Sequence, residues 1–243
     1  MATGTSKSRG LLWAIVGGAV LVAGIVALIV SSFLAQAGPP TTTPSGEPQT
    51  PSPITSDAPK GEFVDKTVAD KGWVPEPITT DAATYVRAAL EAAATFDTTK
   101  STREEWLDYL DTWFTPDTRY TAETDQQAAM AASQLELAQS VVLPQEEWGS
   151  LANEDGRVVA DATGKVTNSP VSDDNAGDMT IATSDVTLTF TRVDGDGEES
   201  SYVEQVRVSV QVLCGPGSVP TPDSAQQAGD CKVVRYFTEP MEP

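Results

Sequence analysis

The sequence has no histidine and only two cysteines. The lack of histidine removes the side chain that most often serves as a general base or a metal ligand near neutral pH. Two cysteines are too few to hold an iron–sulfur cluster or a cysteine-rich zinc ion. We therefore expect no cofactor and no metal centre in this protein.

Basic residues are also scarce, with 15 Lys and Arg against 35 Asp and Glu and a formal net charge of −20. Nonspecific nucleic-acid binding requires basic side chains that neutralise phosphates, so we expect no direct contact with nucleic acid. The sequence also lacks the nucleophile elbow, the P-loop, the dinucleotide-binding fingerprint and the zinc-protease helix motif. These absences predict no catalytic residues and a protein that is not an enzyme.

A long apolar segment lies near the N-terminus. Residues 11–35 carry no charge, and Ser31 and Ser32 are their only polar side chains. At ~1.5 Å per residue, a helix of this length spans roughly 37 Å, which exceeds the ~30 Å hydrocarbon core of a bilayer. We therefore predict a transmembrane signal-anchor helix over residues 11–35.

The flanking charges predict the orientation of this helix. Lys7 and Arg9 precede it, and no basic residue follows until Lys60. By the positive-inside rule, residues 1–10 form a cytoplasmic tail and the bulk of the chain is extracytoplasmic. The predicted location is the cell membrane, crossed once.

A cleaved signal peptide is the alternative to an anchor. Ala35-Gln36-Ala37 fits the small-residue cleavage pattern, so the mature chain would then begin after Ala37. The apolar run is longer than the ~7–15 residues usual for a signal peptide, which favours the anchor. The sequence leaves both readings open.

The chain then changes composition twice. Residues 36–62 are rich in Pro, Thr and Ser and poor in apolar side chains. Such a segment buries too little surface to offset its loss of chain entropy, which predicts an extended linker. Residues 63–243 have a globular composition and suffice for one sizeable core, so we predict a single extracytoplasmic domain there.

Helix signals occupy the first half of this domain. Thr80 or Asp81 can cap a helix that runs to about Phe96. Capping-box pairs beginning at Ser101 and Thr102 predict a second helix, which ends before Pro116, and a weaker third helix covers about 117–138. The second helix has one strongly apolar face, which predicts core positions and, as the alternative, a ligand-binding cluster. The predicted core residues of this helix are Trp106, Leu110, Trp113 and Phe114.

Strand signals fill the second half. A short β segment is predicted at 141–143, a strand with a bulge at Gly164 over 157–167, and a final strand from Cys231. Two alternating runs, 179–193 and 202–213, flank an Asp-Gly turn and predict a hairpin. Helices followed by an antiparallel sheet indicate the α+β class.

Cys214 ends one predicted strand and Cys231 begins the next. Outside the cytoplasm such a pair is usually oxidised, so we predict a disulfide across the Pro- and Gly-rich loop between them. A redox pair is the alternative, although such pairs normally have C-x-x-C spacing.

Two other features allow more than one interpretation. Asp194, Asp196 and Glu198 in the hairpin turn suggest calcium, but Gln205 takes the position where a calcium loop needs Glu, so a plain turn is favoured. Trp148 is a candidate anchor for a protein partner, or it covers one edge of the sheet.

Residues 83–120 resemble stretches in TcpC-type proteins, the bitopic bridging subunits of conjugation and type IV secretion machines. The match comprises an Ala-rich helix, the run TREEW at a helix start, and a Trp-Phe pair before a TP-x-x-RY run. The resemblance implies a cone-shaped domain like nuclear transport factor two, in which about three helices pack on a curved antiparallel sheet. The cysteine pair and its loop depart from the family pattern.

The resemblance implies a structural assembly subunit of a conjugative type IV secretion apparatus, which contacts other envelope subunits and often self-associates. One alternative is an accessory protein of a lipid-import (Mce-type) complex. Another is a ligand-binding or enzymatic cone, for which Asp108, Tyr109 and Asp111 are the candidate cavity residues.

Overall fold

The computed structural model describes residues 63–241. The predicted tail, anchor helix and linker, residues 1–62, lie outside the described residues. No helix within 63–241 is both long enough and apolar enough to cross a membrane.

Helices come first along the described chain, and the long strands follow. The elements are η1 (Lys66–Lys71), α2 (Ala82–Ala92), β1 (Phe96–Asp97), α3 (Arg103–Asp111), α4 (Glu123–Glu136), η2 (Leu137–Val141), α5 (Gln145–Ala152), β2 (Arg157–Asp161), β3 (Thr167–Pro170), β4 (Met179–Val193), β5 (Glu199–Leu213) and β6 (Lys232–Phe237). Here η1 is a 3-10 helix and η2 a short π-helix.

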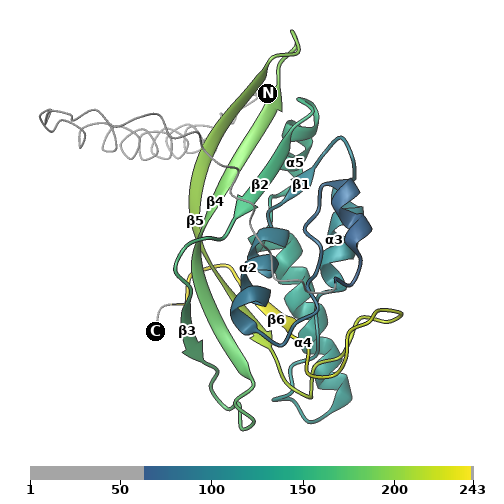
Figure 1. Ribbon diagram of the computed structural model, residues 1–243, viewed down its shortest axis with the longest axis vertical. Helices are drawn as coiled ribbons and strands as arrows, with labels where there is room; N and C mark the ends of the chain where they lie inside the picture. The colour runs from purple at the N-terminus through teal and green to yellow at the C-terminus, as the bar shows by residue number, and fades with distance from the viewer. Residues whose placement is uncertain (1–62, 242–243) are drawn as a thin grey trace, which may run out of the picture. The chain divides into compact units, whose positions relative to one another are not determined.

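The strands form one antiparallel sheet in the order β1-β2-β4-β5-β6, with β3 also paired to β4. Figure 1 shows the helices gathered on one side of this curved sheet. Helix α2 contacts β2, β4 and β5, and α4 contacts β6. The α+β class, with helices packed on a curved antiparallel sheet, is confirmed.

The strand predicted over 157–167 is divided into β2 and β3. Between them, the guanidinium of Arg87 donates to the carbonyl oxygens of Ala162 and Gly164, so these groups do not join the ladder with β4. A Cβ at Gly164 would lie 2.7 Å from the carbonyl oxygen of Asp185, which explains why glycine is needed there.

The region after α4 differs from the predicted pattern. Residues 141–143 form no strand, because Arg103 donates to the carbonyl oxygens of Ala138 and Leu143 and stabilises a turn. An additional helix, α5, follows it. Its first turn begins where the Trp148 amide donates to the carbonyl oxygen of Pro144.

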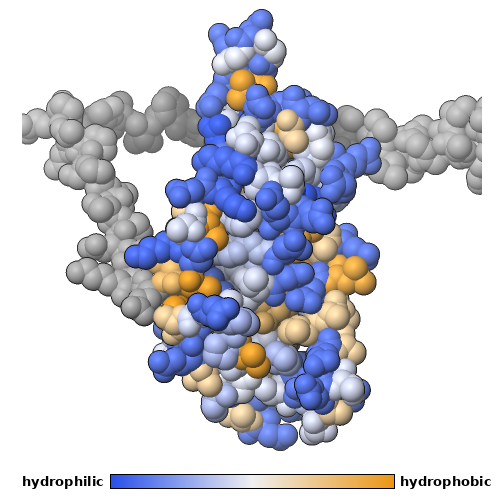
Figure 2. All heavy atoms as spheres, turned by 90° about the vertical axis from the view of Figure 1, so that its right-hand side faces the viewer, coloured by the Kyte–Doolittle hydropathy of each residue, from blue (hydrophilic) through white to orange (hydrophobic). Residues whose placement is uncertain are grey.

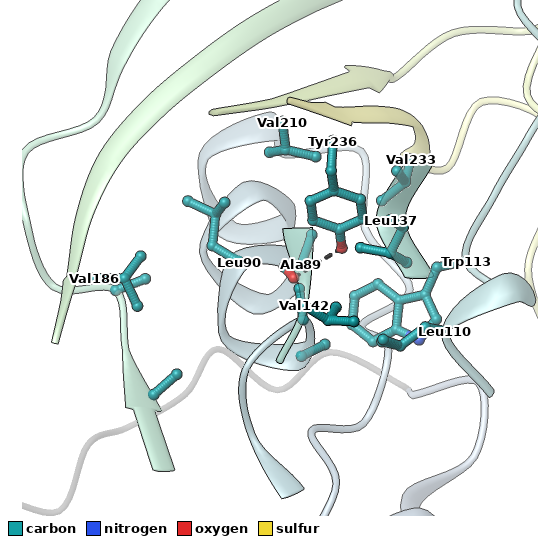
Figure 3. Close-up of a cluster of buried hydrophobic side chains, with 14 of the residues drawn as sticks. Ala89, Leu90, Leu110, Trp113, Leu137, Val142, Val186, Val210, Val233 and Tyr236 are labelled. Atoms are coloured by element: carbon teal, nitrogen blue, oxygen red, sulfur yellow. Dashed lines mark hydrogen bonds between the residues drawn. The ribbon is translucent and has the colours of Figure 1, made fainter. Parts of the chain in front are cut away.

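The core lies between α2, α3, η2, α5 and the facing side of the sheet. Trp106 and Trp113 are fully enclosed, and Leu110 and Phe114 are also buried. Figure 3 shows Leu110, Trp113, Leu137 and Val233 close to Tyr236, whose hydroxyl donates to the carbonyl oxygen of Ala89 at 2.9 Å. Trp106 of α3 and Trp113, in the segment just after α3, therefore fill the centre of the domain.

The start of α3 gives the first testable prediction. Thr102 accepts from the Glu105 amide at 3.2 Å, and the Glu105 carboxylate accepts from the Thr102 amide at 2.9 Å. Thr102→Ala should therefore cost about 1 kcal/mol in the free energy of unfolding, measured by urea titration. Because the two bonds are reciprocal, Thr102→Ala with Glu105→Ala should cost less than the two single changes together; strict additivity would contradict a coupled cap.

Figure 2 shows the helix side of the domain, where hydrophilic side chains cover most of the surface and hydrophobic ones form small, separate patches. A broad protein-docking site is usually marked by a large continuous apolar patch, and the face in this view has none.

Candidate functional site

An apolar groove of about 590 Å³ lies between the end of α2, the turn around η2 and the concave face of the sheet. Its apolar lining includes Leu90, Val142, Val186, Leu188 and Phe190. Figure 3 shows Leu90, Val142 and Val186 in this part of the core. The volume of the groove is typical of small-molecule pockets. Its lining is typical as well, because such pockets are mostly apolar with a few polar groups.

Polar side chains among the groove's lining residues come from η2, from β5 and from Thr238, directly after β6. Gln139 and Ser140 belong to η2, while Glu204 and Arg207 belong to β5. Arg207 also donates to Asp185 at 2.9 Å on the sheet. This arrangement suits an apolar ligand or apolar side chains of a partner more than a substrate that requires acid–base chemistry.

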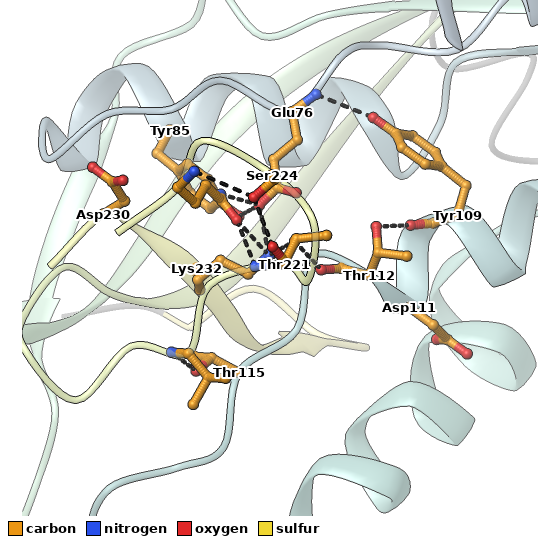
Figure 4. Close-up of polar contacts among 12 residues, drawn as sticks. Glu76, Tyr85, Tyr109, Asp111, Thr112, Thr115, Thr221, Ser224, Asp230 and Lys232 are labelled. Atoms are coloured by element: carbon orange, nitrogen blue, oxygen red, sulfur yellow. Dashed lines mark hydrogen bonds and ion pairs between the residues drawn. The ribbon is translucent and has the colours of Figure 1, made fainter. Parts of the chain in front are cut away.

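A buried ion pair joins the segment before α2 to the first residue of β6 (Figure 4). Nζ of Lys232 donates to Oε1 of Glu76 at 2.9 Å, and the two side chains are 1% and 0% exposed. The Tyr85 hydroxyl donates to the same oxygen at 2.6 Å, and the Gln226 amide donates to it at 3.1 Å. Burial, followed by the Glu76 charge, raises the pKa of Tyr85 well above its ordinary value.

The ammonium of Lys232 has further acceptors. It donates to the Thr112 carbonyl oxygen at 2.7 Å and to the Thr221 hydroxyl at 2.8 Å. Burial lowers the pKa of Lys232, and the Glu76 charge opposes that shift. Oε2 of Glu76 is buried without a hydrogen-bond partner within the described chain. Because the pair is enclosed by protein, it is not accessible to a substrate. Its contacts hold the segment before α2, the end of α3 and the loop 215–230 together.

Cys214 and Cys231 form the predicted disulfide. The bond closes the loop 215–230, which supplies Thr221 and Gln226 to the ion pair. The Cys231 amide also donates to the carbonyl oxygen of Thr79 at 2.8 Å. The disulfide, the loop and the ion pair together hold the segment before α2 against β6.

The candidate cavity residues of α3 do not line the groove. Tyr109 donates to the carbonyl oxygen of Val74 at 2.7 Å, and its ring stacks on Trp73 with centroids 5.0 Å apart. Asp108 and Asp111 are exposed. The three residues therefore do not converge on a common cavity.

Asp111 nevertheless gives a pH-dependent prediction. Neighbouring protein atoms desolvate the Asp111 carboxyl in part, although the residue as a whole stays exposed; this desolvation, followed by the Asp108 charge, raises the pKa of Asp111 from 3.8 to about 6. A raised carboxyl pKa favours the protonated folded state, so the stabilisation present below pH ~4 is lost as the pH rises towards 6. The free energy of unfolding of Asp111→Asn should equal that of wild type at pH 4 and exceed it at pH 7, as measured by urea denaturation at both pH values. The gain should be less than ~1 kcal/mol because the side chain is exposed to solvent.

The control for this prediction is Asp108→Asn, which removes the neighbouring charge and leaves Asp111 able to ionise. It should reduce the pH dependence without abolishing it. A constant difference between Asp111→Asn and wild type from pH 4 to 7 would contradict the raised pKa.

The ring of Trp148 points into the core. It is 5% exposed, and its centroid lies 4.1 Å from that of Phe96 and 5.5 Å from that of Trp106. Because the ring is buried, it offers a partner no surface. It covers β1 at the edge of the sheet instead.

The hairpin turn is organised by its own carboxylate. Oδ1 of Asp194 accepts from the amides of Asp196 and Glu198 at 2.9 and 3.0 Å. Within residues 63–241, no group of three or more Cys, Asp or Glu side chains is arranged to hold a metal ion.

Sequence reasoning missed Glu76 and Lys232. They lie 156 positions apart in the chain, and neither belongs to a recognisable motif. The one available signal was a lysine directly after Cys231, at the start of a strand whose next two residues are valines.

No protein-family model matches the chain, and no curated protein matches it. Among solved structures, it is similar to an IcmL-like type IV secretion system protein from Legionella pneumophila, with 13% identity over 67% of this chain and 95% of that chain and a TM-score of 0.36. CagV, described as a VirB8 homolog of the type IV secretion system of Helicobacter pylori, gives 13% identity over 61% and 89% and a TM-score of 0.33.

A periplasmic fragment of TraM gives 15% identity over 62% of this chain and 89% of that fragment, with a TM-score of 0.29. Two of these three descriptions name type IV secretion.

Proposed function

We propose that this protein is a membrane-anchored assembly subunit of a conjugative type IV secretion apparatus. In this proposal it acts through protein–protein contacts of its extracytoplasmic domain. The observation that carries the proposal is the order of the chain: an uncharged apolar run at 11–35, a Pro-rich segment, and then an α+β domain with the resemblance at 83–120.

The geometry of the domain supports a binding role. Its interior is filled by the rings of Trp106 in α3 and of Trp113 just after α3, and its buried ion pair holds chain segments together. The groove offers an apolar surface to a partner. A non-enzymatic role in assembly uses these features without requiring a catalytic group.

The experiment is cross-linking and pull-down of the full chain from membranes, combined with a transfer assay. Deleting the gene should abolish conjugative transfer, and the full chain should restore it. Variant Leu21→Arg, with a charge in the middle of the apolar run, should fail to restore transfer because central charges oppose membrane insertion. Leu21→Ile is the matched control.

The identity of the captured proteins separates the remaining functions. Capture of coupling or channel subunits supports the proposal. Capture of lipid-import subunits, or undiminished transfer after deletion, would replace it with the envelope alternative.

The groove also favours a second candidate, an apolar-ligand carrier. Saturable binding of a fluorescent fatty acid to the full chain would support this function, and Val186→Asp should abolish that binding because the charge lies in the lining. A matched Val159→Asp change, on a half-exposed residue outside the lining, should leave binding intact.

A further inference from the structure

One half of β5 has an open edge. Strand β5 covers Glu199–Leu213, but β6 pairs only with Ser209–Leu213. Among residues 63–241, no strand pairs with that edge over 199–208. Figure 1 shows the β4–β5 hairpin extending beyond the helices. The open edge is roughly 33 Å long at ~3.3 Å per residue.

The backbone groups on this edge follow from the ladder. The Asp194 amide donates to the Glu198 carbonyl oxygen at 3.0 Å and closes the hairpin, whereas the Val193 amide donates away from β5, to Glu154. Hydrogen-bonded and non-hydrogen-bonded residues alternate along antiparallel strands. Even-numbered residues of β5 therefore bond to β4, and odd-numbered ones direct their amide and carbonyl groups to the open edge.

The side chains along this edge have a symmetric arrangement of charge. Val203 is 60% exposed, and Glu199 and Arg207 lie at equal distances from it along the strand. Both share its side of the sheet, because side chains alternate with a period of two. A twofold axis midway between Val203 and Val203 of a second copy, perpendicular to the sheet, would place Glu199 opposite Arg207 of the second copy, and Arg207 opposite its Glu199. Within one chain Glu199 already accepts from Arg157 and Arg207 already donates to Asp185, each at 2.9 Å, so a contact between Glu199 and Arg207 of two copies would extend these ion pairs into a row of alternating charge.

We propose that β5 pairs antiparallel with β5 of a second copy of this chain, with Val203 opposite Val203. The pairing joins two sheets across the open edges and satisfies the outward backbone groups. Two opposite-charge pairs flank the central valines, and cross-strand pairs of this kind stabilise a sheet. An axis through Glu204 would instead place Glu204 opposite itself, which like-charge repulsion disfavours.

Net charge sets the conditions for the test. The charge of −20 repels a second copy at long range, but ions at ~0.15 M screen interactions beyond ~8 Å and leave contact pairs largely intact. The full chain in detergent at this ionic strength is therefore the sample. Both native cysteines are in the disulfide, so an introduced cysteine supplies a single free thiol.

The first experiment is cross-linking of Val203→Cys with a short bismaleimide. Hydrogen-bonded antiparallel neighbours have Cα atoms ~5.5 Å apart, so covalent dimers are expected. Val159→Cys is the control, because it is 53% exposed and lies two strands further from the edge, in register with Thr189 and Val203. Two copies of Val159 would be roughly 24 Å apart, beyond the reagent. Equal cross-linking of both variants would overturn the proposal.

The second experiment tests the register by sedimentation. Glu199→Gln or Arg207→Gln alone removes both contacts between the two copies and should weaken dimerisation about three- to tenfold. Neutral replacements are used because Glu199 and Arg207 also pair with Arg157 and Asp185 of their own chain, where a reversed charge would meet a like charge. Because each single change already removes both contacts, the combined variant should dimerise no more weakly than either single one, and losses that add up would overturn the register.

A backbone variant completes the test. Val203→Pro removes an outward amide without removing a bond to β4, so the domain should remain folded while the dimer is lost, and Val203→Thr should retain it. A Val203→Pro variant that dimerises like wild type would refute edge pairing. The inference rests on the domain alone, so its failure would leave the proposed secretion role intact, and loss of transfer on gene deletion would not establish it.

Discussion

Replacement of Lys232 by methionine is expected to lower the free energy of unfolding by about 3–5 kcal/mol. The change leaves the Glu76 carboxylate 0% exposed and without its cation, and removal of one partner of a buried pair is costly for this reason. Urea denaturation followed by tryptophan fluorescence measures the loss.

Two further variants show that the effect comes from the buried charge. Glu76→Gln together with Lys232→Met should recover most of the stability, because the amide oxygen can still accept from Tyr85 and Gln226. Arg235→Met, which breaks an exposed pair on the same strand, should cost less than ~1 kcal/mol. Equal costs for Lys232→Met and Arg235→Met would contradict the role of burial.

Loss of the disulfide is the second large effect expected. The bond spans a sequence separation of 17, and constraint of a loop of this size contributes about 3 kcal/mol. The variant with Cys214→Ala and Cys231→Ala should therefore melt about 6–12 °C below the oxidised protein. Calorimetry with and without a thiol reductant measures the difference.

The reductant supplies its own control. It should lower the melting temperature of wild type to that of the double alanine variant and leave the variant unchanged, because the sequence has no other cysteine. If verified reduction leaves the melting temperature of wild type unchanged, the predicted contribution of the disulfide is wrong, and the other contacts of the loop 215–230, such as the ion pair, hold it in place.

The sequence predicts elements whose causes are local. Asp81 and the Thr102–Glu105 pair cap α2 and α3, and the β4–β5 hairpin follows from alternation around an Asp-Gly turn. The cysteines at two strand ends likewise predict their bond. In each case the decisive residues are near one another in the chain or share a simple pattern.

The sequence fails where the cause is a distant contact. Arg87 divides a predicted strand by binding two carbonyl groups more than 70 positions away, and Arg103 holds the turn at 138–143. Trp148 resembles an exposed anchor because its neighbours are acidic, but α5 turns its ring inward. The Glu76–Lys232 pair is likewise assembled by tertiary structure alone.

The contacts that hold residues 73–79 against β6 have a mechanical consequence. A force applied at residue 63 acts first on the Glu76–Lys232 ion pair and on the hydrogen bond from the Cys231 amide to the Thr79 carbonyl oxygen, because both precede α2 in the chain. Those contacts connect to β6 and, through the disulfide, to β5. A pull from that end is therefore distributed into the central strands, and the first helix does not peel away under load.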